Sequence, residues 1–111
     1  MKSSERILEF DVNKQRITKR KSCDFSNIVS GSVGYLKAKF YFSQDEWEGC
    51  RKAASFWLNE EESAVLLNEE DNACMIPSKV LSGEMFKVSV TGVRPDYKIT
   101  TNKTKVRQEV H

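Results

Sequence analysis

Apolar and polar side chains alternate along at least five segments of the chain, and this alternation constrains the fold more than any other feature. Residues 7–12 read ILEFDV, and residues 35–42 read YLKAKFYF. A period of two places successive side chains on opposite faces of an extended backbone, so each such segment predicts a half-buried β-strand. About seven to nine short strands, with no βαβ rhythm between them, predict an all-β sandwich or a small barrel.

The expected elements follow one another without a linker long enough to divide two domains. Strands are predicted at 7–12, 15–19, 35–42, 51–58, 64–67, 73–76, 84–91, 98–101 and 104–110, with a tight turn at Asn13-Lys14, a short strand at 25–29 inside a loop spanning 20–34, charged turns at 59–63 and 68–72, and a turn-rich loop at 92–96. Pro77 stops a strand, and a single helical turn is expected at 78–81. We therefore expect one domain over residues 1–111, with residues 1–5 frayed.

The segment around Trp47 is open to two interpretations. Residues 43–46 read SQDE, the spacing of a helix capping box, and apolar residues recur at near-helical intervals as far as Leu58. Gly49 disfavours a long helix because glycine costs about 1 kcal/mol relative to alanine in a helix interior. We favour one helical turn at 44–48 followed by a strand at 51–58, with a helix over 47–58 as the alternative.

Charge is unevenly distributed along a chain whose net charge is only +2. Residues 1–22 carry seven basic and three acidic side chains, residues 44–72 carry nine acidic and two basic, and residues 78–111 carry seven basic and three acidic. If the two ends meet in the fold, the molecule gains one basic and one acidic region. Such a surface favours complementary docking or head-to-tail association.

The chain shows no sign of export or membrane insertion. The polar N-terminal residues lack the apolar stretch of a signal peptide, and no apolar run approaches the roughly 20 residues of a membrane helix. Cys23, Cys50 and Cys74 are odd in number and widely spaced, which disfavours a disulfide framework and a zinc site. We expect residence in a reducing bacterial cytoplasm, or in a virion assembled there.

Catalytic, cofactor and metal sites are not expected. The only histidine is His111, the last residue, so a triad would need a frayed terminus to hold its base. Carboxylates cluster in the two acidic turns, where solvation is their ordinary explanation, and they lack the order of a calcium loop. We therefore predict that the chain is not an enzyme.

A binding surface is the remaining source of function. Lys37 and Lys39 alternate with Tyr35 and Tyr41 on the outward face of the strand at 35–42, and Trp57 is outward on the strand at 51–58. Aromatic side chains dominate interface energetics and also stack on sugars, so these five residues are candidates for a protein-binding or carbohydrate-binding patch. The same pattern binds single-stranded nucleic acid, although a near-neutral chain with an acidic middle disfavours that partner.

Several segments together resemble a known group of small domains. The resemblance rests on FDVNKQRI at 10–17, YLKAKF at 35–40, DEWEG at 45–49, VLL at 65–67, IP at 76–77, VL at 80–81, FKVSV at 86–90 and TTN at 100–102. These segments are similar to domains encoded in tail and baseplate modules of phages and prophages of Gram-positive bacteria, such as the N-terminal domain of baseplate upper proteins.

The resemblance implies an immunoglobulin-like antiparallel β-sandwich that anchors a larger assembly and has no catalytic or metal residues. It also implies that Trp47 is a packing residue next to a turn. The expected function is a non-enzymatic structural or adaptor domain that docks onto other tail or baseplate proteins, with homo-oligomerisation natural in a symmetric particle. The alternative is a carbohydrate-binding module that recognises a bacterial surface glycan.

Overall fold

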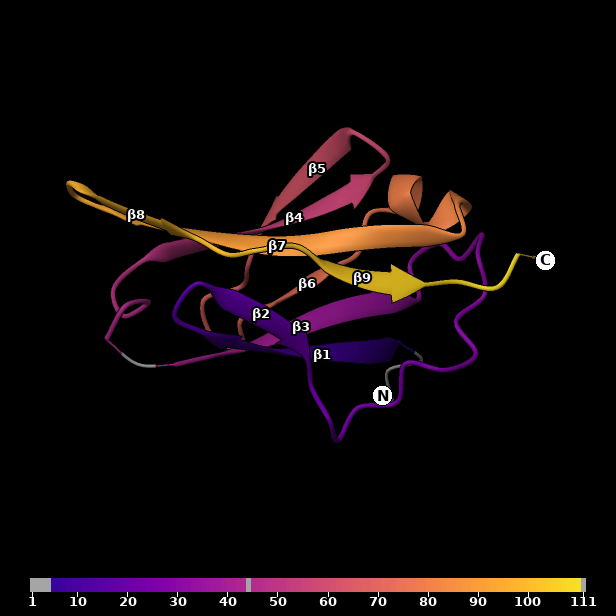
Figure 1. Cartoon of the computed structure of the whole chain (residues 1–111), viewed down its shortest axis with the longest axis horizontal. Helices are drawn as coiled ribbons and strands as arrows, with labels where there is room; N and C mark the ends of the chain where they lie inside the picture. The colour runs from indigo at the N-terminus through magenta and orange to yellow at the C-terminus, as the bar shows by residue number, and fades with distance from the viewer. Residues whose placement is uncertain (1–4, 44, 111) are drawn as a thin grey trace.

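Two β-sheets pack face to face in the computed structural model, which describes residues 5–43 and 45–110 (Figure 1). Within these ranges the chain forms β1 (Arg6–Asn13), β2 (Arg16–Lys19), β3 (Leu36–Phe42), β4 (Arg51–Leu58), β5 (Glu61–Leu66), β6 (Ala73–Met75), the 3₁₀ helix η1 (Ser78–Ser82), β7 (Met85–Arg94), β8 (Tyr97–Thr100) and β9 (Thr104–Arg107). One sheet has the order β2-β1-β3-β6. The other has the order β5-β4-β7-β8, with β9 also paired to β7. The predicted all-β sandwich is confirmed.

Strand pairing is antiparallel except between β1 and β3, which run parallel with Leu8 opposite Ala38 and Phe10 opposite Phe40. The loop at 20–35 makes this pairing possible because it carries the chain back to the end of the sheet at which β1 begins. The Arg6 guanidinium holds this loop by donating to the backbone oxygens of Asp24, Ser26 and Asn27, at 2.7–3.2 Å. Alternation alone specifies a strand but not its partner, so the parallel pair is new information.

The expected loop at 20–34 is confirmed, but the short strand at 25–29 is wrong. In place of a strand, Val29 makes one isolated bridge with Glu109. Two apolar residues of this segment pack into the core instead, since the Phe25 ring lies edge-on to Phe10 at 5.4 Å and Ile28 is buried, whereas Val29 is exposed.

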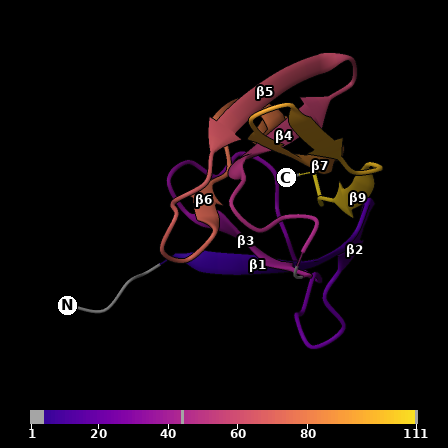
Figure 2. The ribbon, with the colours of Figure 1, turned by 90° about the vertical axis from the view of Figure 1, so that its left-hand side faces the viewer.

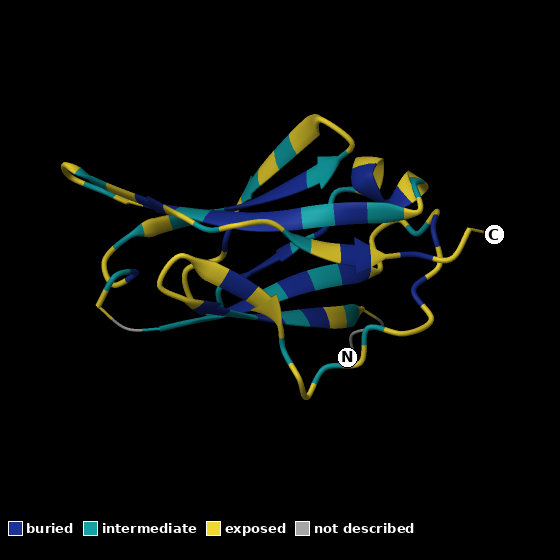
Figure 3. Cartoon of the chain, in the orientation of Figure 1, coloured by how far each residue is buried: buried dark blue, intermediate teal, exposed yellow. Residues whose placement is uncertain are grey.

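Inward-facing side chains of the two sheets form one apolar core. Leu36, Ala38 and Phe40 of β3 are buried, and so are Phe86, Val88 and Val90 of β7, as the alternation predicts. The largest rings meet their neighbours directly, with centroids 5.3 Å apart for Phe10 and Phe40 and 6.4 Å apart for Phe56 and Phe86. Figure 3 shows buried positions alternating with intermediate and exposed ones along the strands.

The region around Trp47 settles the choice between helix and strand. β4 forms at 51–58 as expected, and the alternative helix over 47–58 is wrong. The single helical turn expected at 44–48 is also wrong where it can be examined, because residues 45–49 form turns with Asp45 and Gly49 at positive φ, and Gln44 lies outside the described residues. The Trp47 indole is buried and packs on Phe42, which agrees with the packing role that the resemblance implied.

Other boundaries move by a few residues, mostly where a single residue takes positive φ. The turn of the first hairpin places Lys14 rather than Asn13 in that conformation. The connection expected at 59–63 contracts to a tight turn because Asn59 has φ 57°, so β5 begins at Glu61. The loop expected at 92–96 contracts in the same way around Asp96, which lengthens β7 to Arg94. Of the residues expected to fray, 1–4 lie outside the described ranges.

Gly92 on β7 gives a test of this packing. A Cβ at Gly92 would lie 2.9 Å from the Trp47 ring and 3.1 Å from Cys50 Cβ. Because the ring is buried and cannot withdraw freely, Gly92→Ala is expected to lower the free energy of unfolding by about 1–3 kcal/mol. Urea denaturation measures the loss, with Thr91→Ala on the outward face as a control near zero. Equal stability of both variants would refute the close packing at Gly92.

Candidate docking surfaces

The five predicted surface residues do not lie on one face. Lys37, Lys39 and Tyr41 project from the outer face of the four-stranded sheet, with the exposed Tyr35 just before β3. Trp57 projects from the outer face of the five-stranded sheet, because its neighbours Ala54 and Phe56 in β4 face the core. The full thickness of the sandwich therefore separates Trp57 from the other four.

Tyr41 is already engaged within the molecule. Its hydroxyl donates to the Glu9 carboxylate, and this hydrogen bond raises the pKa of Tyr41. The Arg20 guanidinium lies 3.8 Å from the ring centroid and forms a salt bridge with Asp11 at 2.7 Å. A sugar or a base would bind Tyr41 through its hydroxyl or its ring face. The hydroxyl is already bonded to Glu9, and the ring already has Arg20 over it.

Trp57 lies in a basic environment on the other face. Its Nε1 donates to Ser89 Oγ at 3.2 Å, and the Lys103 ammonium lies 3.7 Å from the ring centroid. Its cross-strand neighbours are Glu62 on β5 and Lys87 on β7. Lys87 in turn lies directly opposite Lys105 on β9. Like charges directly opposite one another destabilise a sheet, so this pair is an electrostatic cost that an external anion would relieve.

We define the outer platform as three neighbouring rows of outward-facing residues on the five-stranded sheet. Its members are Ala53, Ser55 and Trp57 of β4, Glu62, Ala64 and Leu66 of β5, Lys87, Ser89 and Thr91 of β7, Thr100 of β8, Lys105 of β9, and the adjoining Lys103. The serines at its centre are buried and bonded to their larger neighbours: Ser55 donates to the Glu62 carboxylate, and Ser89 accepts from Trp57 Nε1. The largest exposed apolar residue of the platform is Leu66, at 64%.

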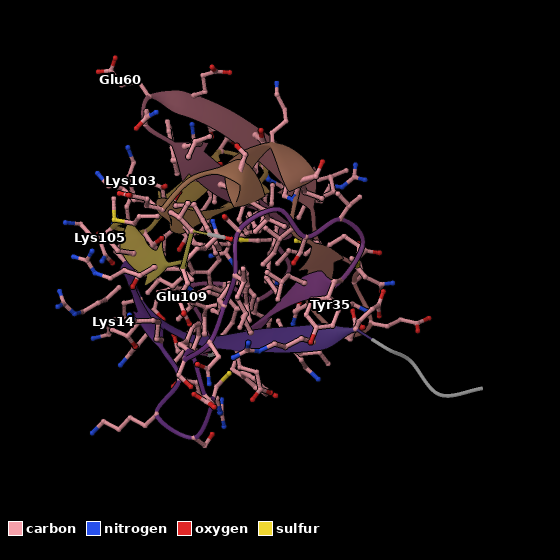
Figure 4. The ribbon with its side chains drawn as sticks, turned by 90° about the vertical axis from the view of Figure 1, so that its right-hand side faces the viewer. Lys14, Tyr35, Glu60, Lys103, Lys105 and Glu109 are labelled. Atoms are coloured by element: carbon pink, nitrogen blue, oxygen red, sulfur yellow. The ribbon has the colours of Figure 1, made fainter. Side chains whose placement is uncertain are left out.

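The N-terminal and C-terminal parts of the chain lie side by side. This was the condition for their basic residues to form one region. Asn102 Oδ1 accepts from Ile17 N at 2.8 Å, and Asn102 N donates to Gln15 O at 3.1 Å. Figure 2 shows β2 and β9 on one side of the sandwich and β5 and β6 on the other. Lys14, Lys103 and Lys105 gather along the first side in Figure 4.

Acidic side chains lie in two places, and one of them is on the lysine side: Figure 4 shows Glu60, in the turn before β5, on the same side as Lys103 and Lys105. Glu61 and Glu62 lie at the start of the edge strand β5, and the exposed Glu69 and Glu70 lie in the turn before β6. Among the described residues, the one salt bridge joins Arg20 and Asp11. The lysines of the β2–β9 side and these carboxylates therefore form no ion pairs with each other within the described part of the chain.

Cysteine and metal chemistry are weakly supported. In the described ranges, no three His, Cys, Asp or Glu side chains lie close enough to hold a metal ion, and His111 is outside those ranges. Cys74 is buried in the apolar core, as its alternation with Ile76 predicts. Burial raises the pKa of the Cys74 thiol to about 12.

A thiol-labelling experiment follows from this difference in burial. At pH 8 very little of the Cys74 thiol is ionised, and the thiolate is the reactive form. We expect iodoacetamide to label Cys23 and Cys50, which are partly exposed, well before Cys74 in the folded protein. Mass spectrometry of the peptides measures the order, and Cys74 should react as fast as the others once urea unfolds the chain. Equal labelling in the folded state would contradict the burial of Cys74.

Several residues of these surfaces carry no sequence signal. Arg6 and Arg20 act through loop carbonyls and a ring that are remote in sequence, so no local spacing marks them. Lys103 lies in an irregular segment, where strand periodicity does not apply. The opposition of Lys87 and Lys105 depends on the pairing of β7 with β9, which alternation does not specify.

The fold and its surfaces define a small all-β sandwich. No protein-family model matches the chain, and no curated protein matches its sequence. No helix in the described residues is long and apolar enough to cross a membrane.

Proposed function

We propose that this chain is a non-enzymatic docking domain, and that it serves as a structural or adaptor part of a phage or prophage tail or baseplate. The observation that carries docking is unpaired surface charge: among the described residues, the lysines of the β2–β9 side form no salt bridge with the carboxylates of β5 or of the turn before β6. Charges arranged in this way steer encounters and fix the orientation of a partner more than they stabilise the fold. The tail or baseplate setting comes from the sequence resemblance.

The interior supports a binding role rather than a catalytic one. The core is a continuous apolar cluster. Among the described residues four polar side chains are buried, Ser30, Ser55, Ser89 and Gln108, and two of them, Ser55 and Ser89, lie on the outer face of the five-stranded sheet. Of these, Gln108 donates to the backbone oxygen of Gly83 at 2.9 Å and so serves to hold η1 against the core. Acid–base chemistry needs titratable groups in a sheltered site, and the charged groups here lie on the surface.

The carbohydrate-binding alternative has a narrower basis. Tyr35 and Tyr41 lie on the face opposite Trp57, so the three aromatic residues cannot stack on one short glycan. Any sugar platform would have to use Trp57 with its neighbour Lys103, or Tyr35 alone. We therefore favour a protein partner over a glycan.

A pull-down tests the proposal. The immobilised chain is incubated with lysate from prophage-induced cells of the bacterium that encodes it, and retained proteins are identified by mass spectrometry. We expect tail or baseplate proteins from the same phage module, and we expect their retention to fall when Lys103 and Lys105 are both replaced by glutamate. A reversal of Lys37 and Lys39 on the other face is the matched control.

Two results would count against the proposal. One is retention of no structural protein of that module by the folded chain. The other is retention of the chain on cell-wall glycan that is lost in Trp57→Ala, which would favour the carbohydrate-binding alternative.

A further inference from the structure

The outer platform has a pattern of charge and size that is complementary to itself. Across the sheet from β5 to β9, one row reads Glu62, Trp57, Lys87, Lys105. A carboxylate therefore lies at one end of the row and an ammonium at the other. Three strand spacings separate them, about 14 Å, so they cannot pair within one chain.

The next rows contain small or neutral side chains. Ala64, Ser55 and Ser89 form the second row, and Leu66, Ala53, Thr91 and Thr100 form the third. In the second row Ser55 and Ser89 are buried, because Ser55 donates to the Glu62 carboxylate and Ser89 accepts from Trp57 Nε1, whereas Leu66 in the third row supplies apolar area that is otherwise exposed to water. Two sheets pack face to face at about 10 Å when their facing side chains are of this kind.

We propose that the outer platform is the interface of a two-fold symmetric dimer of this chain. The symmetry axis runs parallel to the strands, between β4 and β7, so that β5 of one copy lies over β9 of its partner. The interface is isologous, so each contact between two different residues occurs twice. This inference deepens the proposed function, because it assigns one docking surface and its occupant.

This axis brings complementary groups together in every row. Glu62 of each copy meets Lys105 of the other, and the added cation Lys103 lies on the same side as Lys105. Trp57, whose ring already has the Lys103 ammonium of its own chain 3.7 Å from its centroid, lies opposite Lys87 of the partner copy. Ser55 meets Ser89, and Ala53 meets Thr91. No row places two like charges opposite each other.

The arrangement also accounts for the uncompensated cations. Lys87 and Lys105 repel each other within one sheet, and within the described residues neither has a carboxylate in salt-bridge range. A second copy supplies Glu62 beside them. The acidic strand β5 of a second copy therefore supplies the charge that is complementary to these lysines.

Sedimentation velocity and light scattering over a range of protein concentrations test the dimer. We expect the wild-type chain to be a dimer that weakens as salt is added, because the end contacts are ion pairs at the edge of the interface. Ala64→Arg places a long cation on the edge strand β5, within the proposed interface, and is expected to give a monomer. Ala64 is exposed, so the variant should keep its fold, which circular dichroism verifies.

Charge reversal provides the sharper test. Glu62→Lys and Lys105→Glu are each expected to raise the dimer dissociation constant tenfold or more, because each creates two like-charge contacts per dimer. The double variant that carries both changes should regain affinity, since the swapped pair is again complementary. Lys39→Glu, on the opposite face of the sandwich, is the control and should leave the dissociation constant unchanged.

The outcomes separate this inference from the proposed function. A monomeric wild-type chain, or a double variant no tighter than either single variant, overturns the two-fold dimer. If such a chain still retains tail proteins in the pull-down, the docking role stands without the dimer. If the chain is a dimer but retains no tail proteins, the dimer stands and the docking role is contradicted.

Discussion

Replacing Trp47 by alanine is expected to lower the free energy of unfolding by about 3–5 kcal/mol, the range for truncating a large buried aromatic residue. The indole is 1% exposed and packs on the Phe42 ring with centroids 4.9 Å apart. Its Nε1 donates to Lys14 O at 2.8 Å, and its ring lies against Gly92 of the other sheet. The substitution would remove contacts with both sheets at once and leave a cavity between them.

Trp57→Ala is the matched control, because the same residue type is removed from the surface. Trp57 is partly exposed and contacts Ser89 and Lys103 rather than the core. Its loss is expected to cost about 1 kcal/mol or less. Urea denaturation of both variants, analysed with one shared m-value, gives the two losses in the free energy of unfolding. Similar losses for the two tryptophans would contradict the placement of Trp47 in the core.

Asn102→Leu is expected to lower the free energy of unfolding by about 1–3 kcal/mol, because it leaves a strand donor without its partner. Asn102 Oδ1 accepts from Ile17 N at 2.8 Å, and Nδ2 lies 3.5 Å from Ile17 O. The side chain thus pairs with the free edge of β2 as another strand would. This contact ties the first hairpin to the segment before β9, so its loss should loosen the seam between the two sheets.

Asn102→Asp tests whether Oδ1, the atom that accepts from Ile17 N, is what stabilises the contact. Aspartate keeps the oxygen that accepts from Ile17 N and loses only the weaker contact through Nδ2. We expect it to retain most of the stability that Asn102→Leu loses, and thermal unfolding followed by circular dichroism provides the measurement. If the two variants unfold alike, the Ile17 hydrogen bond is not what stabilises the seam.

The strands were predictable because their cause is local. A buried layer on one side and water on the other impose a period of two, and the segment at 35–42 carries that signal in its own letters. The segment at 51–58 was also assigned correctly, although Trp47 and Leu58 allowed a helical interpretation. Gly49, which takes φ 77° in the turn, was the residue that argued against the helix.

The pairing of strands was less predictable because its cause is not local. The parallel contact between β1 and β3 depends on where a 16-residue loop returns the chain, and Arg6 holds that loop through three carbonyls. The ends of strands also depend on turn residues. Asparagine at position 59 takes positive φ, but in the first hairpin it is Lys14 that does so, and no propensity favours lysine there.

For the candidate surface, too, local features were predictable from the sequence and non-local ones were not. Outward directions were predicted correctly for Lys37, Lys39, Tyr41 and Trp57, because direction follows from alternation. Their grouping was not, since it depends on which strands belong to which sheet. Placing β3 and β4 in different layers separates Trp57 from the tyrosines and brings it beside Lys87 and Lys103 instead.

The central claim is that this chain acts by docking into a larger particle, and the most direct measurement is its distribution between particle and free protein. Phage or tail particles from induced cells are separated on a density gradient, and each fraction is analysed for the chain by quantitative mass spectrometry. We predict a fixed number of copies per particle, maintained through repeated purification. Particles that lack the chain while it remains entirely in the free fraction would contradict the claim.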